Sequence, residues 1–216
     1  MKRSLIIIGA GSVGGHIAYN LNSYNLEEYN LLGFLDDDPN KVNKEFCGYP
    51  ILGNVDHITF LAKDVAVIIG IAFPFMKQDI IARLSKLGKF EYPYLIAKTA
   101  WISKAITIQE GVIIYPGCSI NYGTSIDSFV VMNMNCAIGH DCSIGAYSSL
   151  APGVNLAGHT SLGIGVDMGI SSSTKQGVCI GNNSIVGGQS MLINDIPESV
   201  VVAGVPAKRI KANHHL

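Results

Sequence analysis

An aliphatic residue or methionine occupies every sixth position between Ile102 and Leu192, with a single exception at Thr174. A period of six fits neither an α-helix, which repeats about every 3.6 residues, nor a flat strand, which alternates roughly every two. It predicts a chain that turns a corner every six residues, so that each hexapeptide forms one short side of a coil. The series comprises Ile102, Ile108, Ile114, Ile120, Ile126, Met132, Ile138, Ile144, Leu150, Leu156, Leu162, Met168, Ile180, Val186 and Leu192.

A second pattern runs two positions ahead of the first, where every residue is small or β-branched, as at Val112, Cys118 and Thr124. Residues two apart lie on the same side of a strand, so each side of the coil sends one large and one small residue inward. The sequence therefore predicts a parallel β-helix of about 18 residues per coil. Glycines are expected at corners that need a positive φ, namely Gly139, Gly145, Gly163, Gly169, Gly181 and Gly187.

The chain before residue 98 has a different pattern, in which apolar strands alternate with helical stretches. Strands are expected at residues 4–8, 31–35, 65–71 and 92–96, and helices near 13–23 and 75–87. Such alternation predicts a parallel sheet covered on both faces. We therefore expect an α/β, Rossmann-like head over residues 1–97, followed by an all-β domain over residues 98–216.

A glycine-rich turn between the first strand and the first helix is the candidate ligand site of the head. Backbone N–H groups at the start of a helix bind phosphate groups. Asp36 and Asp37 follow the second strand, where related folds bind a ribose hydroxyl. Because the head is short and no second dehydrogenase domain follows, a nucleotide-type ligand is favoured over NAD; a tight turn without a ligand is the alternative. The turn residues are Gly9, Gly11, Ser12 and Gly14.

His140 is the candidate catalytic residue of the coil, because its place between two inward-facing residues puts it at a corner. Asp141 adjoins it, and a carboxylate beside an imidazole fixes the tautomer that a general base requires. An exposed loop histidine is the alternative interpretation. His159 follows 19 residues later, but a stacked pair of histidines does not make a complete zinc site, because zinc requires three ligands. We therefore expect no metal.

Composition excludes several classes of protein. The net charge is −1 and only 14% of the residues are charged, whereas a nucleic-acid-binding protein needs a basic face. The apolar start lacks a signal-peptide cleavage site, and no run is long enough to span a membrane. Three of the five cysteines, Cys118, Cys136 and Cys142, take inward positions, which favours buried thiols in a reducing cytoplasm. His214 and His215 lie in a polar tail and are not expected to bind metal.

The repeat, the segment 139–145 and the terminal segment 203–210 resemble the left-handed β-helix acyltransferases. With the small head, nearly the whole chain resembles the bacterial sugar N-acetyltransferases of the PglD/NeuD type. The resemblance implies a left-handed coil, a homotrimer, acetyl-CoA bound between adjacent helices, and a nucleotide-linked amino sugar held by the head. The chain departs from the family in a glycine-rich turn that is one residue longer, and in Ile69-Gly70-Ile71 where relatives have Ile-Gly-Asn.

The resemblance also implies roles for individual residues. His140 matches the general base and Asp141 its acidic partner. Gly158 matches a glycine whose amide meets the thioester carbonyl. The implied CoA-binding residues are Asn133, Ser149, Gly158, Ile170 and Gly188, although some relatives carry histidine in place of Ser149. The implied substrate-binding residues are Gly9, Gly11, Ser12, Gly14, Asp36, Asp37 and Gly70.

These residues lead to one main expectation and two alternatives. The chain is expected to transfer an acetyl group from acetyl-CoA to the amine of a nucleotide-linked amino sugar, in bacterial surface glycan or glycoprotein sugar synthesis. The amine attacks the thioester directly, with His140 as the base. O-acetylation of a sugar or sialic acid is the first alternative, because the same base deprotonates a hydroxyl. A non-catalytic trimeric scaffold that binds a nucleotide is the second.

Overall fold

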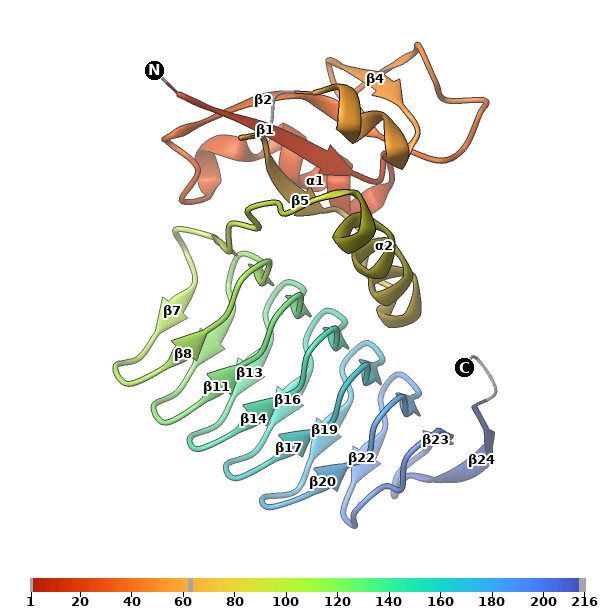
Figure 1. Ribbon diagram of the computed structural model, residues 1–216. Helices are drawn as coiled ribbons and strands as arrows, with labels where there is room; N and C mark the ends of the chain where they lie inside the picture. Colours follow the sequence, from red (N-terminus) through yellow and green to blue (C-terminus); the bar gives the residue numbers. More distant parts are fainter. Residues whose placement is uncertain (1, 62–63, 214–216) are drawn as a thin grey trace. The chain divides into compact units, whose positions relative to one another are not determined.

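The computed structural model describes residues 2–61 and 64–213, in two compact units (Figure 1). The head comprises the chain up to Ala72 together with Met76–Pro93, and the coil unit comprises Phe73–Phe75 and the chain from Tyr94 onward. Residues 94–97, which the sequence analysis assigned to the head, therefore belong to the coil unit. His214 and His215 lie outside the described residues.

The head contains a five-stranded sheet in the order β3-β4-β2-β1-β5. Its central strands are parallel and rich in β-branched and aliphatic residues, and Leu5 to Ile8 are almost fully buried, as expected for strands covered on both faces. The strands are β1 (Arg3–Ile8), β2 (Tyr29–Leu35), β3 (Glu45–Phe46), β4 (Tyr49–Gly53) and β5 (Ala66–Ile69). The helices are α1 (Ser12–Tyr19) and α2 (Pro74–Leu87), with 3-10 turns at Leu21–Ser23 and Val55–Phe60.

Two features of the head differ from the sequence prediction. Strands β3 and β4 form an antiparallel hairpin that the sequence analysis missed, because β3 has only two residues. Their turn, at Cys47 and Gly48, has the positive φ values of a tight hairpin turn, but Cys47 is not one of the residues that usually signal such a turn. The strand predicted at residues 92–96 shrinks to β6 (Leu95–Ile96) and pairs with a strand of the coil unit rather than with the head sheet.

The coil unit is a parallel β-helix whose three sides form three sheets (Figure 1). One sheet has six strands: β7 (Trp101–Ile102), β10 (Ser119–Ile120), β13 (Ala137–Ile138), β16 (Asn155–Leu156), β19 (Ser173–Thr174) and β22 (Met191–Leu192). A second has five: β8 (Thr107–Ile108), β11 (Ser125–Ile126), β14 (Ser143–Ile144), β17 (Ser161–Leu162) and β20 (Cys179–Ile180). The third has eight: β6, β9 (Ile113–Ile114), β12 (Val131–Met132), β15 (Ser149–Leu150), β18 (Asp167–Met168), β21 (Ile185–Val186), β23 (Val200–Ala203) and β24 (Lys208–Ala212).

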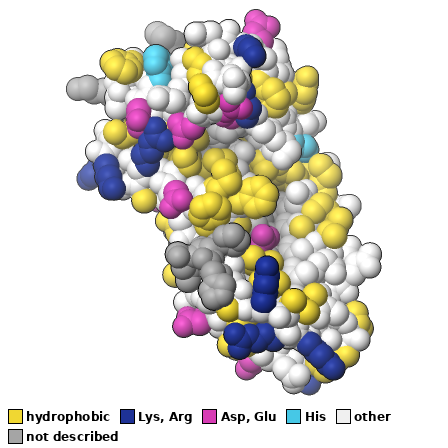
Figure 2. Space-filling view, turned by 90° about the vertical axis from the view of Figure 1, so that its right-hand side faces the viewer, with side chains coloured by type: hydrophobic (Ala, Val, Ile, Leu, Met, Phe, Trp, Pro, Cys, Tyr) yellow, Lys and Arg dark blue, Asp and Glu magenta, His cyan; other side chains and the backbone are white. Residues whose placement is uncertain are grey.

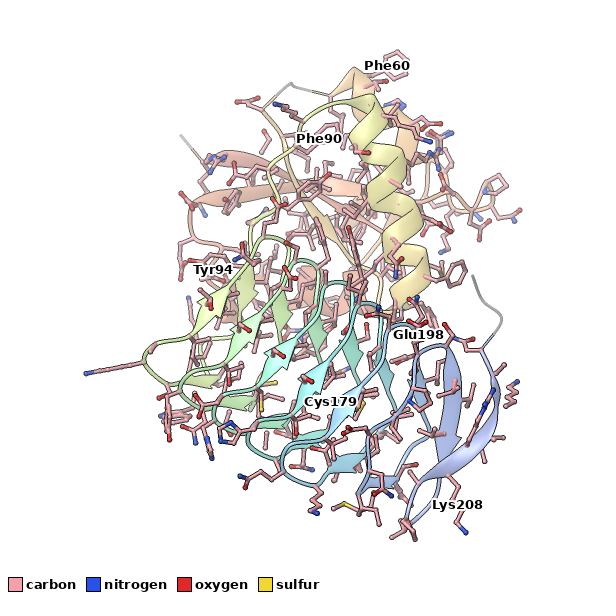
Figure 3. All side chains as sticks on the ribbon, turned by 60° about the horizontal axis from the view of Figure 1, so that its bottom comes forward. Phe60, Phe90, Tyr94, Cys179, Glu198 and Lys208 are labelled. Carbon is pink, nitrogen blue, oxygen red and sulfur yellow. The ribbon has the colours of Figure 1, made fainter. Side chains whose placement is uncertain are left out.

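Register and burial in the coil follow the six-residue repeat. Residues 18 apart pair directly, as Ile126 does with Ile108 and with Ile144. The repeat positions form one continuous apolar core, and Cys118, Cys136 and Cys142 are buried within it as free thiols. The predicted inward positions of these three cysteines are thus confirmed, whereas Cys179, labelled in Figure 3, is exposed.

The expected reason for the corner glycines is wrong. Positive φ values fall two residues later in the corner, on residues such as Asp141 (55°) and His159 (58°). Gly139 is required for a different reason, because a Cβ there would lie 2.5 Å from the amide nitrogen of Gly158 in the next coil. These glycines therefore permit close stacking of the coils. The left-handed conformation is carried by other glycines, such as Gly153 and Gly165, and by residues such as Asp141 and Asn183.

The distribution of charged side chains on the surface is consistent with the net charge of −1. On the face that Figure 2 shows, acidic and basic side chains are interspersed and form no single basic patch. Within the described residues, no helix combines the length and apolarity needed to cross a bilayer.

Candidate active site

His140 and Asp141 occupy the corner between β13 and β14, where the coil turns from the six-stranded to the five-stranded sheet. Nδ1 of His140 lies 2.8 Å from Oδ2 of Asp141, and the two side chains are 34% and 42% exposed. Because an ionised carboxylate only accepts hydrogen bonds, Nδ1 carries the proton and the lone pair is on Nε2. The pair therefore has the tautomer and the solvent access that a general base needs.

Gly158 lies directly beside this imidazole, one coil further along. A Cβ at Gly158 would be 2.6 Å from Nε2 of His140, so only glycine leaves room for the ring in its present position. Among the described residues, the amide of Gly158 donates to no acceptor, although its carbonyl accepts from Gly177. A free backbone donor next to the basic nitrogen is the arrangement that stabilises an oxyanion in acyl transfer.

Two further rings surround His140. The phenol of Tyr122, from the preceding coil, is stacked on the imidazole with centroids 5.5 Å apart, and His159, from the following coil, meets it edge-on at 4.9 Å. Donor atoms of His140, Asp141 and His159 all lie within 4.8 Å of one another, a spacing that could hold a cation. Nδ1 of His140 is already bonded to Asp141, however, so the pair serves the imidazole as well as any cation.

The residues proposed to bind CoA fall into two groups on one chain. Gly158 lies at the His140 corner, whereas Asn133, Ile170 and Gly188 follow strands of the eight-stranded sheet and lie at the corner before the six-stranded sheet. Ile170 is 55% exposed, and a Cβ on Gly188 would be 3.0 Å from its Cγ2. The two corners are separated by the width of the six-stranded sheet, so one copy of the chain does not bring both groups together.

Ser149 differs from the other proposed CoA-binding residues because it is only 6% exposed. It lies in β15, within a strand rather than at a corner. A contact with CoA at this position would therefore require the Ser149 side chain to be uncovered.

Three glycines of the head pack the turn against the sheet. A Cβ on Gly70 would lie 2.9 Å from Cγ2 of Ile7 and 3.0 Å from Cα of Gly14, and a Cβ on Gly14 would collide with the carbonyl of Gly9. Gly9 itself has a φ of 100°. These three residues are therefore needed for the close approach of the turn, α1 and the end of β5.

Gly11 and Ser12 are placed differently from the packing glycines. Gly11 is the N-cap of α1, no side chain caps the helix there, and a Cβ on Gly11 would meet nothing within 4 Å. Ser12 is the first residue of α1. The predicted phosphate-binding residues thus separate into a packing group and an open group at the start of the helix.

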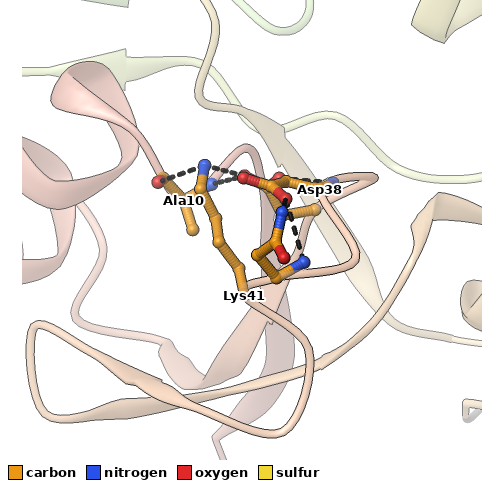
Figure 4. A network of polar contacts seen from close by, with 5 residues as sticks. Ala10, Asp38 and Lys41 are labelled. Carbon is orange, nitrogen blue, oxygen red and sulfur yellow. Dashed lines mark hydrogen bonds and ion pairs between the residues drawn. The ribbon is translucent and has the colours of Figure 1, made fainter.

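Asp36 is bonded to the glycine-rich turn rather than left free (Figure 4). Its Oδ2 accepts from the amide of Ala10 at 2.8 Å and from Nζ of Lys41 at 3.0 Å, and its Oδ1 accepts from the amide of Asp38. Burial raises the pKa of Asp36, but these hydrogen bonds outweigh burial and hold the pKa below its usual value. Lys41 also donates to the carbonyl of Ala10.

Asp37 belongs to a second polar network. Its carboxylate accepts from the amide of Val55 and from Arg83, and Arg83 also bonds Asp56. The hydrogen bond from Arg83 lowers the pKa of Asp56, and Asp56 and Asp37 together raise the pKa of the guanidinium. Both acids predicted to contact a ribose therefore also hold the head together.

Several residues of these sites escaped the sequence analysis. Tyr122 could have been found, because it lies 18 residues before His140, the coil period that stacks corners on one another. Lys41 and Arg83 carry no such signal, because Arg83 meets Asp37 from 46 residues away through folding of the head.

Known proteins resemble both the head and the coil unit of this chain. Residues 4–84 match the PglD N-terminal domain. The acetyltransferase domain of PglB from Neisseria gonorrhoeae FA1090, solved with acetyl coenzyme A, is 25% identical with a TM-score of 0.87, covering 97% of this chain and 100% of that one. PerB from Caulobacter crescentus, solved with CoA and GDP-perosamine, is 27% identical with a TM-score of 0.87, covering 96% of this chain and 97% of the other.

Curated relatives match only part of the chain. A putative lipopolysaccharide biosynthesis O-acetyl transferase, WbbJ of Escherichia coli K12, is 43% identical over 54 residues, which is 25% of this chain and 28% of that protein. The chain spans less than a third of the length of the curated relatives it matches.

The fold comparison agrees with the class expected from the sequence, a Rossmann-like head followed by a left-handed parallel β-helix of hexapeptide repeats. The head match and the full-length structural matches extend well beyond the motifs at residues 139–145 and 203–210. Over nearly its whole length the chain resembles the sugar N-acetyltransferases of the PglD/NeuD type, and its residues 4–84 match the PglD N-terminal domain.

Proposed function

We propose that this protein is an acyltransferase that moves the acetyl group of acetyl-CoA to the amine of a nucleotide-linked amino sugar. The observation that carries the proposal is the corner of the coil, where Nε2 of His140 lies against Gly158 and Nδ1 is bonded to Asp141. Similarity to PglB solved with acetyl-CoA and to PerB solved with GDP-perosamine supports both substrates.

The residues of the corner have distinct roles in the proposed reaction. The nitrogen of the sugar amine attacks the thioester carbon, and His140 accepts the proton that this nitrogen loses. Asp141 keeps the imidazole in the correct tautomer, and the amide of Gly158 donates to the developing oxyanion. The carbon–sulfur bond then breaks, and the proton held by His140 goes to the departing thiolate. No covalent acyl-enzyme is needed.

Substrate recognition is assigned to the head and to the corners of the coil. Gly11 and Ser12, at the open start of α1, are proposed to bind phosphate, and Gly9, Gly14 and Gly70 to shape that site. Asp36 and Asp37 are proposed to contact the nucleoside while keeping their bonds to the head. Asn133, Ser149, Ile170 and Gly188 are proposed to line the path of CoA.

The division of the CoA-binding residues between two corners supports a homotrimer. A single copy separates the His140 corner from Ile170 and Gly188 by one face of the coil, so a complete site needs a corner from each of two copies. Threefold symmetry repeats such a heterologous contact and closes it into a ring. A cytoplasmic location and a place in surface glycan or glycoprotein sugar synthesis are proposed from the substrates and the buried free thiols.

The decisive experiment is a panel of nucleotide-linked 4-amino sugars offered with acetyl-CoA, followed by release of free thiol. We expect turnover of at least one member, and a fall in kcat of roughly 10²- to 10⁴-fold for His140→Ala. Asp141→Asn, which keeps the shape but not the charge, should show a smaller loss. Near-normal turnover by a folded His140→Ala protein would refute the role of this base.

O-acetyl transfer is the second candidate, and the 43% identity to the putative O-acetyl transferase WbbJ favours it. The same panel should include sugars with a hydroxyl in place of the amine, and turnover of those alone would select this candidate. A non-catalytic nucleotide-binding scaffold predicts no binding of acetyl-CoA. A rise in melting temperature with acetyl-CoA therefore argues against the scaffold.

A further inference from the structure

Tyr122 lies against the imidazole of His140 and is set there by the backbone. The two rings are nearly parallel, with an interplanar angle of 16° and centroids 5.5 Å apart. The amide of Asp141 donates to the carbonyl of Tyr122 at 2.9 Å, and the amide of Tyr122 is bonded to Oδ1 of Asn121 at 2.8 Å. The main chain therefore fixes the distance between the coils that carry the two rings.

His159 contacts the same imidazole from the following coil. Its amide donates to the carbonyl of His140 at 2.9 Å, and its ring meets the His140 ring edge-on at an interplanar angle of 87°. The imidazole of His140 is thus in contact with one ring from the coil before it and one from the coil after it.

The ring of Tyr122 contributes little to the coil itself. It is 52% exposed, and His140 is the only aromatic ring it stacks on among the residues that the structure describes. The same corner position holds Lys104, Gly158 and Gln176 in other coils, so the β-helix does not require an aromatic side chain there. Its ring contact is with the proposed base.

The hydrogen bond to Asp141 alone is a weak restraint on His140, because both side chains are more than a third exposed and water competes for it. If the imidazole turned about its Cβ–Cγ bond, Nδ1 would leave Asp141 and Nε2 would leave Gly158. A flat ring stacked on the imidazole opposes that rotation, and aromatic pairs favour such offset stacking.

We infer that Tyr122 is a positioning residue for the proposed base, which with the edge of His159 holds the His140 ring in the plane that directs Nε2 toward Gly158. The inference rests on the proposed acyl transfer. The role inferred for Tyr122 is distinct from the catalytic roles in that reaction, because Tyr122 neither touches the reacting atoms nor transfers a proton.

The test compares Tyr122→Leu, which removes the ring, with Tyr122→Phe, which keeps it. We expect kcat to fall about tenfold in Tyr122→Leu, because small misplacements of a catalytic group are costly, with unchanged KM for both substrates. Tyr122→Phe should keep near wild-type kcat. Ile164→Ala, another exposed side chain at a coil corner, is the matched control and should have no effect. Equal kcat for Tyr122→Leu and wild type would overturn the inference.

A double-mutant cycle separates positioning from a general structural role. In a His140→Ala background, Tyr122→Leu should cause no further loss, because there is no ring left to position. An additional loss of similar size in that background would show that Tyr122 acts by another route.

A readout that needs no turnover keeps this test distinct from the test of the proposed function. Carbethoxylation of Nε2 of His140 by diethyl pyrocarbonate, followed by mass spectrometry, should change in rate by severalfold in Tyr122→Leu and stay at the wild-type rate in Tyr122→Phe. Unchanged rates in both variants would overturn the inference even if the wild-type protein acetylated no sugar of the panel. Inactivity of the wild-type protein alone would count against the proposed function.

Discussion

At the scale of single residues, the carboxylates proposed to bind substrate in the head already form hydrogen bonds within the head. Asp36 is the clearest case, because its two oxygens bond the amides of Ala10 and Asp38 and the ammonium of Lys41. The resemblance assigns Asp36 to the substrate, yet its side chain is only 12% exposed. We therefore interpret Asp36 first as the residue that holds the glycine-rich turn in its binding conformation.

This interpretation predicts a pH-dependent loss of stability in Asp36→Asn. The folded pKa of Asp36 is lower than the unfolded one, so its contribution is present above the unfolded pKa and is lost as the pH falls through the folded pKa. Urea unfolding at pH 7 should show the variant less stable by about 1–3 kcal/mol, and the difference should shrink below about pH 4.

The control for Asp36→Asn is Asp38→Asn, which removes a charge from the same loop but keeps an Oδ1 that can accept both bonds from Asn40. It should cost less at pH 7. A deficit of Asp36→Asn that stayed constant from pH 7 to pH 3 would contradict the proposed linkage.

At the scale of the structural element, Thr174 explains the one break in the repeat. Its side chain is 5% exposed in β19, and its Oγ1 accepts from the amide of Ala157 at 3.1 Å and pairs with Oγ1 of Thr160 at 2.9 Å. Ala157 precedes Gly158, so this buried hydroxyl supports the segment that carries the free amide. A polar residue at an apolar position is here satisfied by a bond that only the stacked coils provide.

We predict that Thr174→Val destabilises the coil by about 1–2 kcal/mol, because it removes a hydrogen-bond partner from a buried hydroxyl and from a partly buried amide. Ser172→Ala is the opposite case within the same coil. Its Oγ is buried and has no hydrogen-bond partner among the described residues, so its loss should be neutral or slightly stabilising. Chemical unfolding of both variants measures these changes in the free energy of unfolding. A Thr174→Val protein more stable than wild type would contradict the prediction, because it would show that an aliphatic side chain at this position stabilises the coil more than the hydroxyl pair does.

At the scale of the whole molecule, we propose that a second copy of the chain completes the site. His140 and Gly158 lie at one corner of the coil, and Ile170 and Gly188 at another. If each site takes one corner from each of two neighbours, two different inactive variants should restore activity when they assemble together.

The predicted complementation uses His140→Ala and Ile170→Asp, each inactive alone. Refolding them together in equal amounts should restore about one quarter of wild-type activity, since half of the subunits supply an intact His140 corner and half of their neighbours an intact Ile170 corner. Light scattering should give the mass of three chains. Mixed assemblies without any recovered activity would contradict a site shared between copies.

Much of the fold could be predicted from the sequence because the apolar residues of the coil repeat at regular intervals. The side chain alternates every second residue within a strand and the chain turns after every sixth, so the apolar pattern alone determined the coil, its register and the buried thiols. Local chemistry determined the pairing of His140 with Asp141, because the two residues are adjacent in the chain. The hairpin of β3 and β4 escaped because β3 has only two residues, too few to carry a periodic pattern.

Only the tertiary structure decided which residues meet across coils and across the head. Stacking placed Tyr122 and His159 on the ring of His140 and brought the backbone of Gly158 beside its Nε2. Folding of the head brought Lys41 to Asp36 and Arg83 to Asp37. The physical reason is that an apolar repeat specifies which side chains are buried, whereas the contacts of exposed polar and aromatic side chains depend on the positions of backbones that are distant in sequence.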